Sequence, residues 1–186
     1  RSDRSTYKLL GGSIGFYGST LNTRQYATKG YLEKLIAQVF TGRERFEPGN
    51  PQEGYSPSPQ ERQSWLQISY MKEAYHTMGP KFTLGWMAEA LYSSKNFSEN
   101  YTATMMQAGE FAPTPHSKLM YNEAFRANQY VAAGIKPIYV LNDMFQFRTE
   151  FYGFTPIFPI KKNALNKAYY GKAFSRFEYM GEVSVI

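Results

Sequence analysis

The sequence has no cysteine among its 186 residues and only two histidines, His76 and His116. Without cysteine, neither disulfide bonds nor thiolate chemistry is available, and the two histidines have no neighbours at metal-ligand spacing. We therefore expect no metal site and no cofactor. Only two aspartates occur, Asp3 and Asp143, so a mechanism that needs an aspartate partner has few candidates.

Long apolar runs are also missing. No stretch of about eighteen apolar residues occurs, which excludes a membrane-spanning helix. A spanning β-barrel stays allowed, because its strands need only about 9–11 residues of alternating polarity. The sequence begins at Arg1 without a basic and then apolar leader, and we expect a mature product or an internal fragment.

Aromatic residues are abundant, with 16 Tyr and 14 Phe beside 15 Gly, although the mean hydropathy is only −0.50. The formal charge of +6 could suit nucleic acid or an anionic membrane surface. The 21 Lys and Arg are scattered and form no basic run, which favours the membrane surface. We expect no nucleic-acid partner.

Polarity alternates with a period of two along most of the sequence. In 81–93, the even positions from Phe82 to Tyr92 are apolar, and the odd positions are mostly small or charged. Similar alternation runs through 7–17, 31–41, 65–76, 130–139, 144–154 and 174–186. This pattern predicts about seven antiparallel strands. They are longer than the strands of soluble sheets, which average about 5–6 residues.

The connections between these strands alternate in length. Short ones lie at 78–80 and 141–143, and long polar or Pro- and Gly-rich ones lie at 43–62, 93–128 and 155–172. Short turns at one end and long loops at the other are typical of outer-membrane barrels. A soluble antiparallel sandwich with aromatic-rich faces remains an alternative.

The segment 22–38, "NTRQYATKGYLEKLIAQ", resembles a recurrent segment of the BamA superfamily of outer-membrane barrels. That segment typically reads Asp-x-Arg-Asp, then an aromatic residue and Pro-Thr-x-Gly, and opens a long strand. Asn stands here for the leading Asp, and Ala27 for the Pro. The matching residues are Asn22, Arg24, Tyr26, Thr28 and Gly30. We expect a polar turn here, with Gly30 permitting a tight backbone where the next strand begins.

The segment 124–135, "AFRANQYVAAGI", resembles the inward-folded loop of the same superfamily, which carries a Val-Arg-Gly-Phe motif. Phe125, Arg126 and Ala127 occupy the first three places of that motif. The resemblance implies that Arg126 enters the lumen and is held there by acidic groups. Glu150 and Glu178, on the polar faces of predicted strands, are the partners that this sequence offers. An ordinary surface-loop arginine remains an alternative.

The longer segment 123–160 is similar to the C-terminal barrel of patatin-like phospholipases of Bacteroidetes type. This resemblance implies an all-β antiparallel transmembrane barrel, of which residues 1–186 form about seven strands out of roughly sixteen. The chain would then be a single-domain fragment of the later part of the barrel, in the bacterial outer membrane. Its implied partners are outer-membrane lipid, the remainder of its own barrel, and upstream patatin and periplasmic domains.

Three functions follow as hypotheses. The first is a barrel that anchors an upstream phospholipase domain. An extended form of this hypothesis is that the barrel also helps to export that domain. The second is a BamA-type barrel for protein assembly or translocation. The third is an enzyme that acts through Ser13, because Gly11, Ser13 and Gly15 spell the G-x-S-x-G of a nucleophile elbow. An elbow requires a strand, a strained turn and a helix, whereas Ser13 lies within a predicted strand and the sequence has no Asp-Gly pair. We predict no catalytic residue in this chain.

Overall fold

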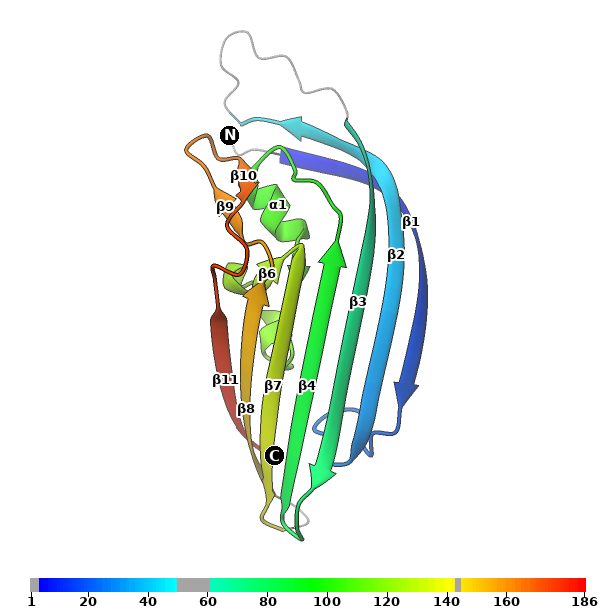
Figure 1. Ribbon diagram of the computed structural model, residues 1–186, viewed down its shortest axis with the longest axis vertical. Coiled ribbons are helices and arrows are strands. Elements are labelled where there is room, and N and C mark those ends of the chain that lie inside the picture. Colours follow the sequence, from blue (N-terminus) through cyan, green and yellow to red (C-terminus); the bar gives the residue numbers. More distant parts are fainter. Residues whose placement is uncertain (1–3, 50–60, 143–144) are drawn as a thin grey trace.

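The computed structural model describes residues 4–49, 61–142 and 145–186. Its main feature is one antiparallel sheet of seven strands in the order β1-β2-β3-β4-β7-β8-β11. The strands are β1 (Arg4–Ser19), β2 (Gly30–Glu47), β3 (Glu61–Thr77), β4 (Phe82–Ser93), β7 (Gln129–Val140), β8 (Gln146–Pro156) and β11 (Glu178–Val185). Each strand pairs with its sequence neighbour within the sheet, so the sheet is a meander of hairpins (Figure 1).

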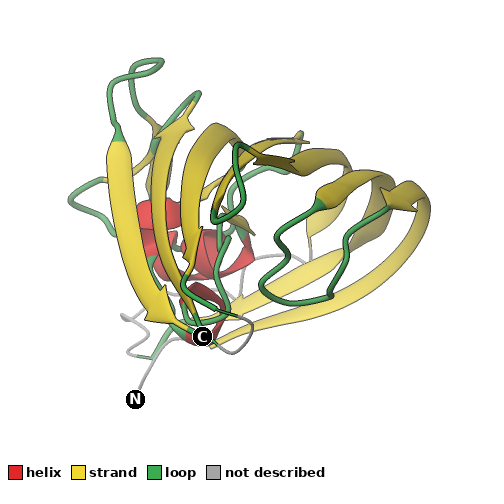
Figure 2. Cartoon of the chain, turned by 90° about the horizontal axis from the view of Figure 1, so that it is seen from below, coloured by secondary structure: helices red, strands yellow, loops and turns green. Residues whose placement is uncertain are grey.

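The sheet is strongly curved, and the smaller elements lie on its concave side (Figure 2). The connection between β4 and β7 contains α1 (Tyr101–Gln107), β5 (Gly109–Glu110), η1 (Ser117–Leu119), η2 (Glu123–Phe125) and β6 (Arg126–Ala127). A small hairpin, β9 (Ile160–Lys162) and β10 (Ala168–Tyr170), lies between β8 and β11. Within the described ranges, no helix has the length and hydropathy needed to cross a membrane.

The prediction of an all-β antiparallel sheet is confirmed, and each of the seven predicted strands corresponds to one strand of this sheet. The predicted strand 174–186 begins later, at Glu178, because Phe174 has a φ of 51° that an extended strand does not allow. The β2 and β3 strands extend into the predicted loop 43–62. Asp3, Asp143 and Met144 lie outside the described residues.

Barrel closure is not seen. Among the described residues, β1 and β11 each pair with one neighbour only, so the sheet is open at both edges. Among the fully described connections, the short ones, 20–29 and 78–81, lie at the lower end in Figure 1, and the long ones, 94–128 and 157–177, begin at the upper end.

The polarity of the two faces of the sheet is the reverse of that in a water-soluble sheet. We call the concave side the inner face and the convex side the outer face. On β4, the inner positions Thr83 and Met87 are buried, whereas the outer aromatic residues Phe82 and Tyr92 are 38% and 47% exposed. Charged residues of β7 and β8, such as Lys136 and Arg148, point inward and are buried. The apolar face predicted from alternation is therefore the exposed one.

Candidate functional site

The inner face is covered by the connection 94–128, which we call the inserted segment. Phe111, Phe125 and Ala127 of this segment are buried in one cluster with inner-face side chains of the three strands β4, β7 and β8, namely Met87, Leu91, Tyr130, Ala132, Tyr152 and Phe154. The rings of Phe111 and Phe154 stack with their centroids 5.9 Å apart. The segment expected to fold inward thus packs on the concave side.

Arg126 is held within the inserted segment. Its Nη2 lies 2.7 Å from Oε2 of Glu110, which is directly opposite it in the β5–β6 ladder. Its Nη1 donates to the carbonyl oxygens of Met106 at 3.1 Å and Ala108 at 3.3 Å, and its guanidinium lies 4.8 Å from the ring centroid of Tyr121. The guanidinium therefore links different parts of the inserted segment to one another.

The two predicted partners of Arg126 pair with other arginines. Glu150 and Glu178 do lie on the inner side of their strands, but each pairs with an arginine two residues away on the chain. Arg148 Nε bonds to Glu150, and Arg176 Nε lies 2.7 Å from Glu178. The predicted pairing of Arg126 with either glutamate is wrong. The β5–β6 ladder of two residues places Glu110 directly opposite Arg126, and Glu110 pairs with the guanidinium instead.

Below the inserted segment, the inner face holds a network of buried charges around Arg148. Arg148 is 2% exposed, and its Nη2 donates to the Tyr75 hydroxyl at 2.8 Å. Tyr75 in turn donates to Glu73, and Glu73 accepts from Lys136 Nζ at 2.9 Å. Tyr152 donates to Glu150. Each buried charge has an opposite partner, as the cost of desolvation requires.

The turn 20–29 closes this end of the inner face. The Asn22 carboxamide oxygen accepts from the backbone N–H groups of Thr28 at 3.0 Å and Lys29 at 3.1 Å. Gly30 has a φ of +90°, and a Cβ there would lie 2.2 Å from the Thr20 carbonyl oxygen. Arg148 Nη1 donates to the Ala27 carbonyl at 3.0 Å, across 121 positions of sequence.

Three residues of the predicted turn motif therefore act together, Asn22 and Thr28 through hydrogen bonds and Gly30 through its backbone angle. Arg24 is exposed, and no hydrogen bond or ion pair joins it to a described residue. The motif thus builds a turn that docks on the inner face. Sequence reasoning missed the docking partner, Arg148, for which no local signal exists.

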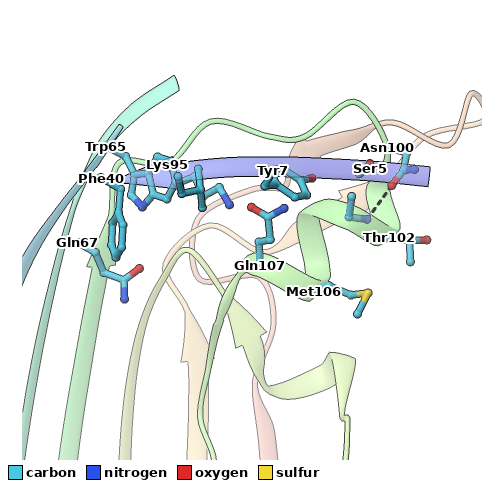
Figure 3. A pocket seen from close by; sticks show the side chains of 12 residues that line it. Ser5, Tyr7, Phe40, Trp65, Gln67, Lys95, Asn100, Thr102, Met106 and Gln107 are labelled. Carbon is cyan, nitrogen blue, oxygen red and sulfur yellow. Dashed lines mark hydrogen bonds between the residues drawn. The ribbon is translucent and has the colours of Figure 1, made fainter. Parts of the chain in front are cut away.

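A cavity of about 830 Å³ lies between α1 and the upper inner face of β1, β2 and β3 (Figure 3). Phe40 and Trp65 stack at one side of it, with their ring centroids 5.0 Å apart. Lys95 is 8% exposed, and its Nζ lies 4.8 Å from the Trp65 centroid. Burial lowers the pKa of the Lys95 ammonium to about 8, and nearby Glu44 opposes that shift. The cavity wall is mostly apolar and contains one cationic group, the Lys95 ammonium.

Ser13 lies in the middle of β1, directly opposite Gln38 of β2, and the strand continues to Ser19. The strand-turn-helix geometry of a nucleophile elbow is therefore not present at this serine. Packing explains the glycine at position 11, because a Cβ there would lie 2.6 Å from the ring of Phe40 on the neighbouring strand.

Within the described ranges, no group of three or more His, Asp or Glu side chains is arranged to hold a metal ion. No protein-family model matches the chain, and no curated protein or solved structure shows significant similarity to it.

Proposed function

We propose that this chain is part of an outer-membrane β-barrel, that its outer face contacts lipid, and that the barrel anchors an upstream patatin-like phospholipase domain. The observation that carries the membrane part of the proposal is the inversion of polarity between the two faces of the sheet. The upstream domain rests on the similarity of segment 123–160 to barrels of that kind.

The outer face of β4 carries a long uncharged stretch. On β4, every outward residue from Phe82 to Tyr92 is uncharged, and these two aromatic residues are ten positions apart. Ten residues extend about 33 Å along a strand, which a tilt of about 40° projects to about 25 Å. This is the height of the apolar band of outer-membrane barrels, which aromatic residues flank at both interfaces.

Uncharged stretches of the same length occur on β2 and β3, where charged residues mark their limits. They are displaced along the strands relative to that of β4, because Lys72 of β3 is directly opposite Ala88. On β2, the outward positions between Glu33 and Arg43 carry no charge, and on β3 the same holds between Lys72 and Arg62. Glu33 is directly opposite Lys72, and Arg43 is directly opposite Arg62. Two neighbouring strands thus change from uncharged to charged at the same two levels.

Aromatic residues also form a row at the end with the short turns. Phe82, Tyr139 and Phe147 are directly opposite one another on β4, β7 and β8, and all three are exposed on the outer face. Exposed rings in a row, at the limit of an uncharged band, fit a lipid–water interface.

The two tryptophans provide the test, because Trp86 lies on the outer face and Trp65 is buried on the inner face. A Trp65→Phe variant, which retains Trp86, is reconstituted into vesicles of brominated or ordinary phosphatidylcholine. We expect strong quenching of Trp86 fluorescence by the brominated chains, and little quenching of Trp65 in the matched Trp86→Phe variant. Equal quenching of both, or a monodisperse monomer in water without detergent, would refute the lipid contact.

The second candidate is a BamA-type assembly barrel, which the Phe125–Ala127 motif and the inserted segment support equally. The residues upstream of this chain separate the two. An anchor requires a patatin domain with a Ser–Asp dyad, and an assembly barrel requires several periplasmic repeat domains. Fatty-acid release from phospholipid by the full-length protein supports the first candidate, and its absence supports the second.

A further inference from the structure

Three basic residues lie in one row on the outer face. Lys8 of β1 is directly opposite Arg43 of β2, and Arg43 is directly opposite Arg62 of β3. All three are exposed. We call them the basic row. It borders a shallow depression of about 480 Å³, which Leu10 and Thr41 also line.

The basic row is not neutralised by the part of the chain that the structure describes. No described carboxylate lies within 4 Å of these three cations, and the nearest polar contact is Arg62 Nε with Thr41 Oγ1 at 3.5 Å. Glu44, next to Arg43, points to the opposite face and is buried there. Like charges directly opposite on paired strands destabilise a sheet, so an anion from outside would relieve the repulsion.

The opposite end of the band differs. There, Lys72 Nζ lies 3.7 Å from Glu33, and the Tyr70 hydroxyl donates to the same glutamate at 2.6 Å. That cation is paired, and the basic row is not. Of the two charged limits described on β2 and β3, the one at the end with the long connections therefore carries the uncompensated positive charge.

The residues next to the basic row indicate what carries the anion. The following row of the outer face is Leu10, Thr41 and Ser64, in which Thr41 and Ser64 share a hydrogen bond of 2.9 Å. Below them come Val39 and Leu66, which are exposed and apolar. Cations, then hydroxyls, then aliphatic groups match the order of groups in a phospholipid, from phosphate through ester to acyl chain.

We propose that the basic row binds the phosphate of an anionic lipid headgroup in the leaflet at the long-connection end. This inference rests on the proposed membrane location of the outer face. A lipid phosphate and a free phosphate share the chemistry that guanidinium and ammonium groups recognise. The lipid is the proposed source because the acyl chain would run along the uncharged band.

The test uses the full chain in micelles of an uncharged maltoside detergent, titrated with phosphatidylglycerol or phosphatidylcholine. Bound lipid is counted by native mass spectrometry. We expect phosphatidylglycerol to bind at least about tenfold tighter, because each cation near an anionic lipid surface contributes appreciably. The K8Q/R43Q/R62Q variant should lose this preference. The matched variant K29Q/K81Q/K172Q, which removes three exposed lysines from turns and loops, should keep it.

Retention of the preference in the row variant, or an equal loss in the matched variant, would overturn the inference. So would displacement of phosphatidylglycerol by inorganic phosphate at equal concentration, which would show a free-anion site. If the triple variant fails to fold, the single R43Q change should still lower the preference about fivefold. Equal binding of both lipids defeats this inference alone. Absence of lipid binding, together with an unquenched Trp86, defeats the membrane location itself.

Discussion

At the scale of single residues, Arg126 illustrates how a largely covered charge fixes a long connection. Its guanidinium joins three kinds of partner: the Glu110 carboxylate, the backbone carbonyls at the C-terminal end of α1, and the Tyr121 ring. These contacts hold β5 and β6 together where the inserted segment returns to the sheet. Once the side chain is covered, water no longer solvates the guanidinium, so these protein contacts must compensate its charge.

We expect Arg126→Glu to destabilise the inserted segment by about 1–3 kcal/mol, because it places two carboxylates opposite each other in the β5–β6 ladder. Adding Glu110→Arg should restore part of that loss, since the ion pair reforms while the carbonyl contacts stay lost. Thermal unfolding and the rate of proteolysis within 94–128 measure both steps.

The control for this charge reversal is Glu178→Arg in the Arg126→Glu background. Glu178 pairs with Arg176 and does not contact Arg126, so this reversal should restore nothing. Rescue by Glu178→Arg but not by Glu110→Arg would contradict the pairing.

At the scale of elements, neighbouring strands interlock through rings that lie over glycines on the inner face. Gly134 of β7 is directly opposite Tyr152 of β8, and a Cβ at this glycine would lie 2.2 Å from the tyrosine ring. Gly85 of β4 and Tyr75 of β3 repeat the arrangement at 2.6 Å. A ring covering a glycine on the adjacent strand helps to fix the register of a curved sheet.

Gly134→Ala should therefore cost about 1–3 kcal/mol, because Tyr152 must leave its rotamer or the strands must separate. Gly12→Ala on β1 is the matched control, since a Cβ there meets no atom within 4 Å, and its effect should stay within about 0.5 kcal/mol. Denaturant unfolding in detergent compares the two. Equal costs would show that strand geometry, not the ring, limits this position.

The strands and their faces were predictable because alternation is a local signal that every residue of a strand repeats. Asn22, Thr28 and Gly30 were predictable for a similar reason, since their turn closes within ten residues. The partner of Arg126 was not predictable from the strand faces, because Glu110 lies on a ladder of only two residues. The contact between Arg148 and Ala27 depends on how far the sheet curves, which no segment of the sequence encodes alone.

At the scale of the whole molecule, the proposed membrane location makes substitutions on the outer face depend on depth. Ile135 and Val131 both point outward from β7 and are similarly exposed, at 50% and 41%. Ile135 is near the middle of the strand and Val131 near its upper end. In water, arginine at either site would be harmless. In a bilayer, only the deeper site is costly.

Relative to the alanine variant at each position, Ile135→Arg should cost about 2–4 kcal/mol and Val131→Arg clearly less, in vesicles of phosphatidylcholine. Reversible urea unfolding, followed by the intrinsic fluorescence of the chain, gives both values. Near-zero costs at both sites would instead indicate a face exposed to water. That result would revive the soluble sandwich.

The bond from Arg148 to the Ala27 carbonyl also constrains the order in which the chain assembles. The first hairpin is complete by Glu47, yet its turn is fastened by a side chain on β8 that lies 121 positions further along. Contacts so distant in sequence form late, because the intervening chain must first be ordered. The turn between β1 and β2 closes through its own hydrogen bonds, but it docks on the inner face only when β8, the sixth strand, joins the sheet.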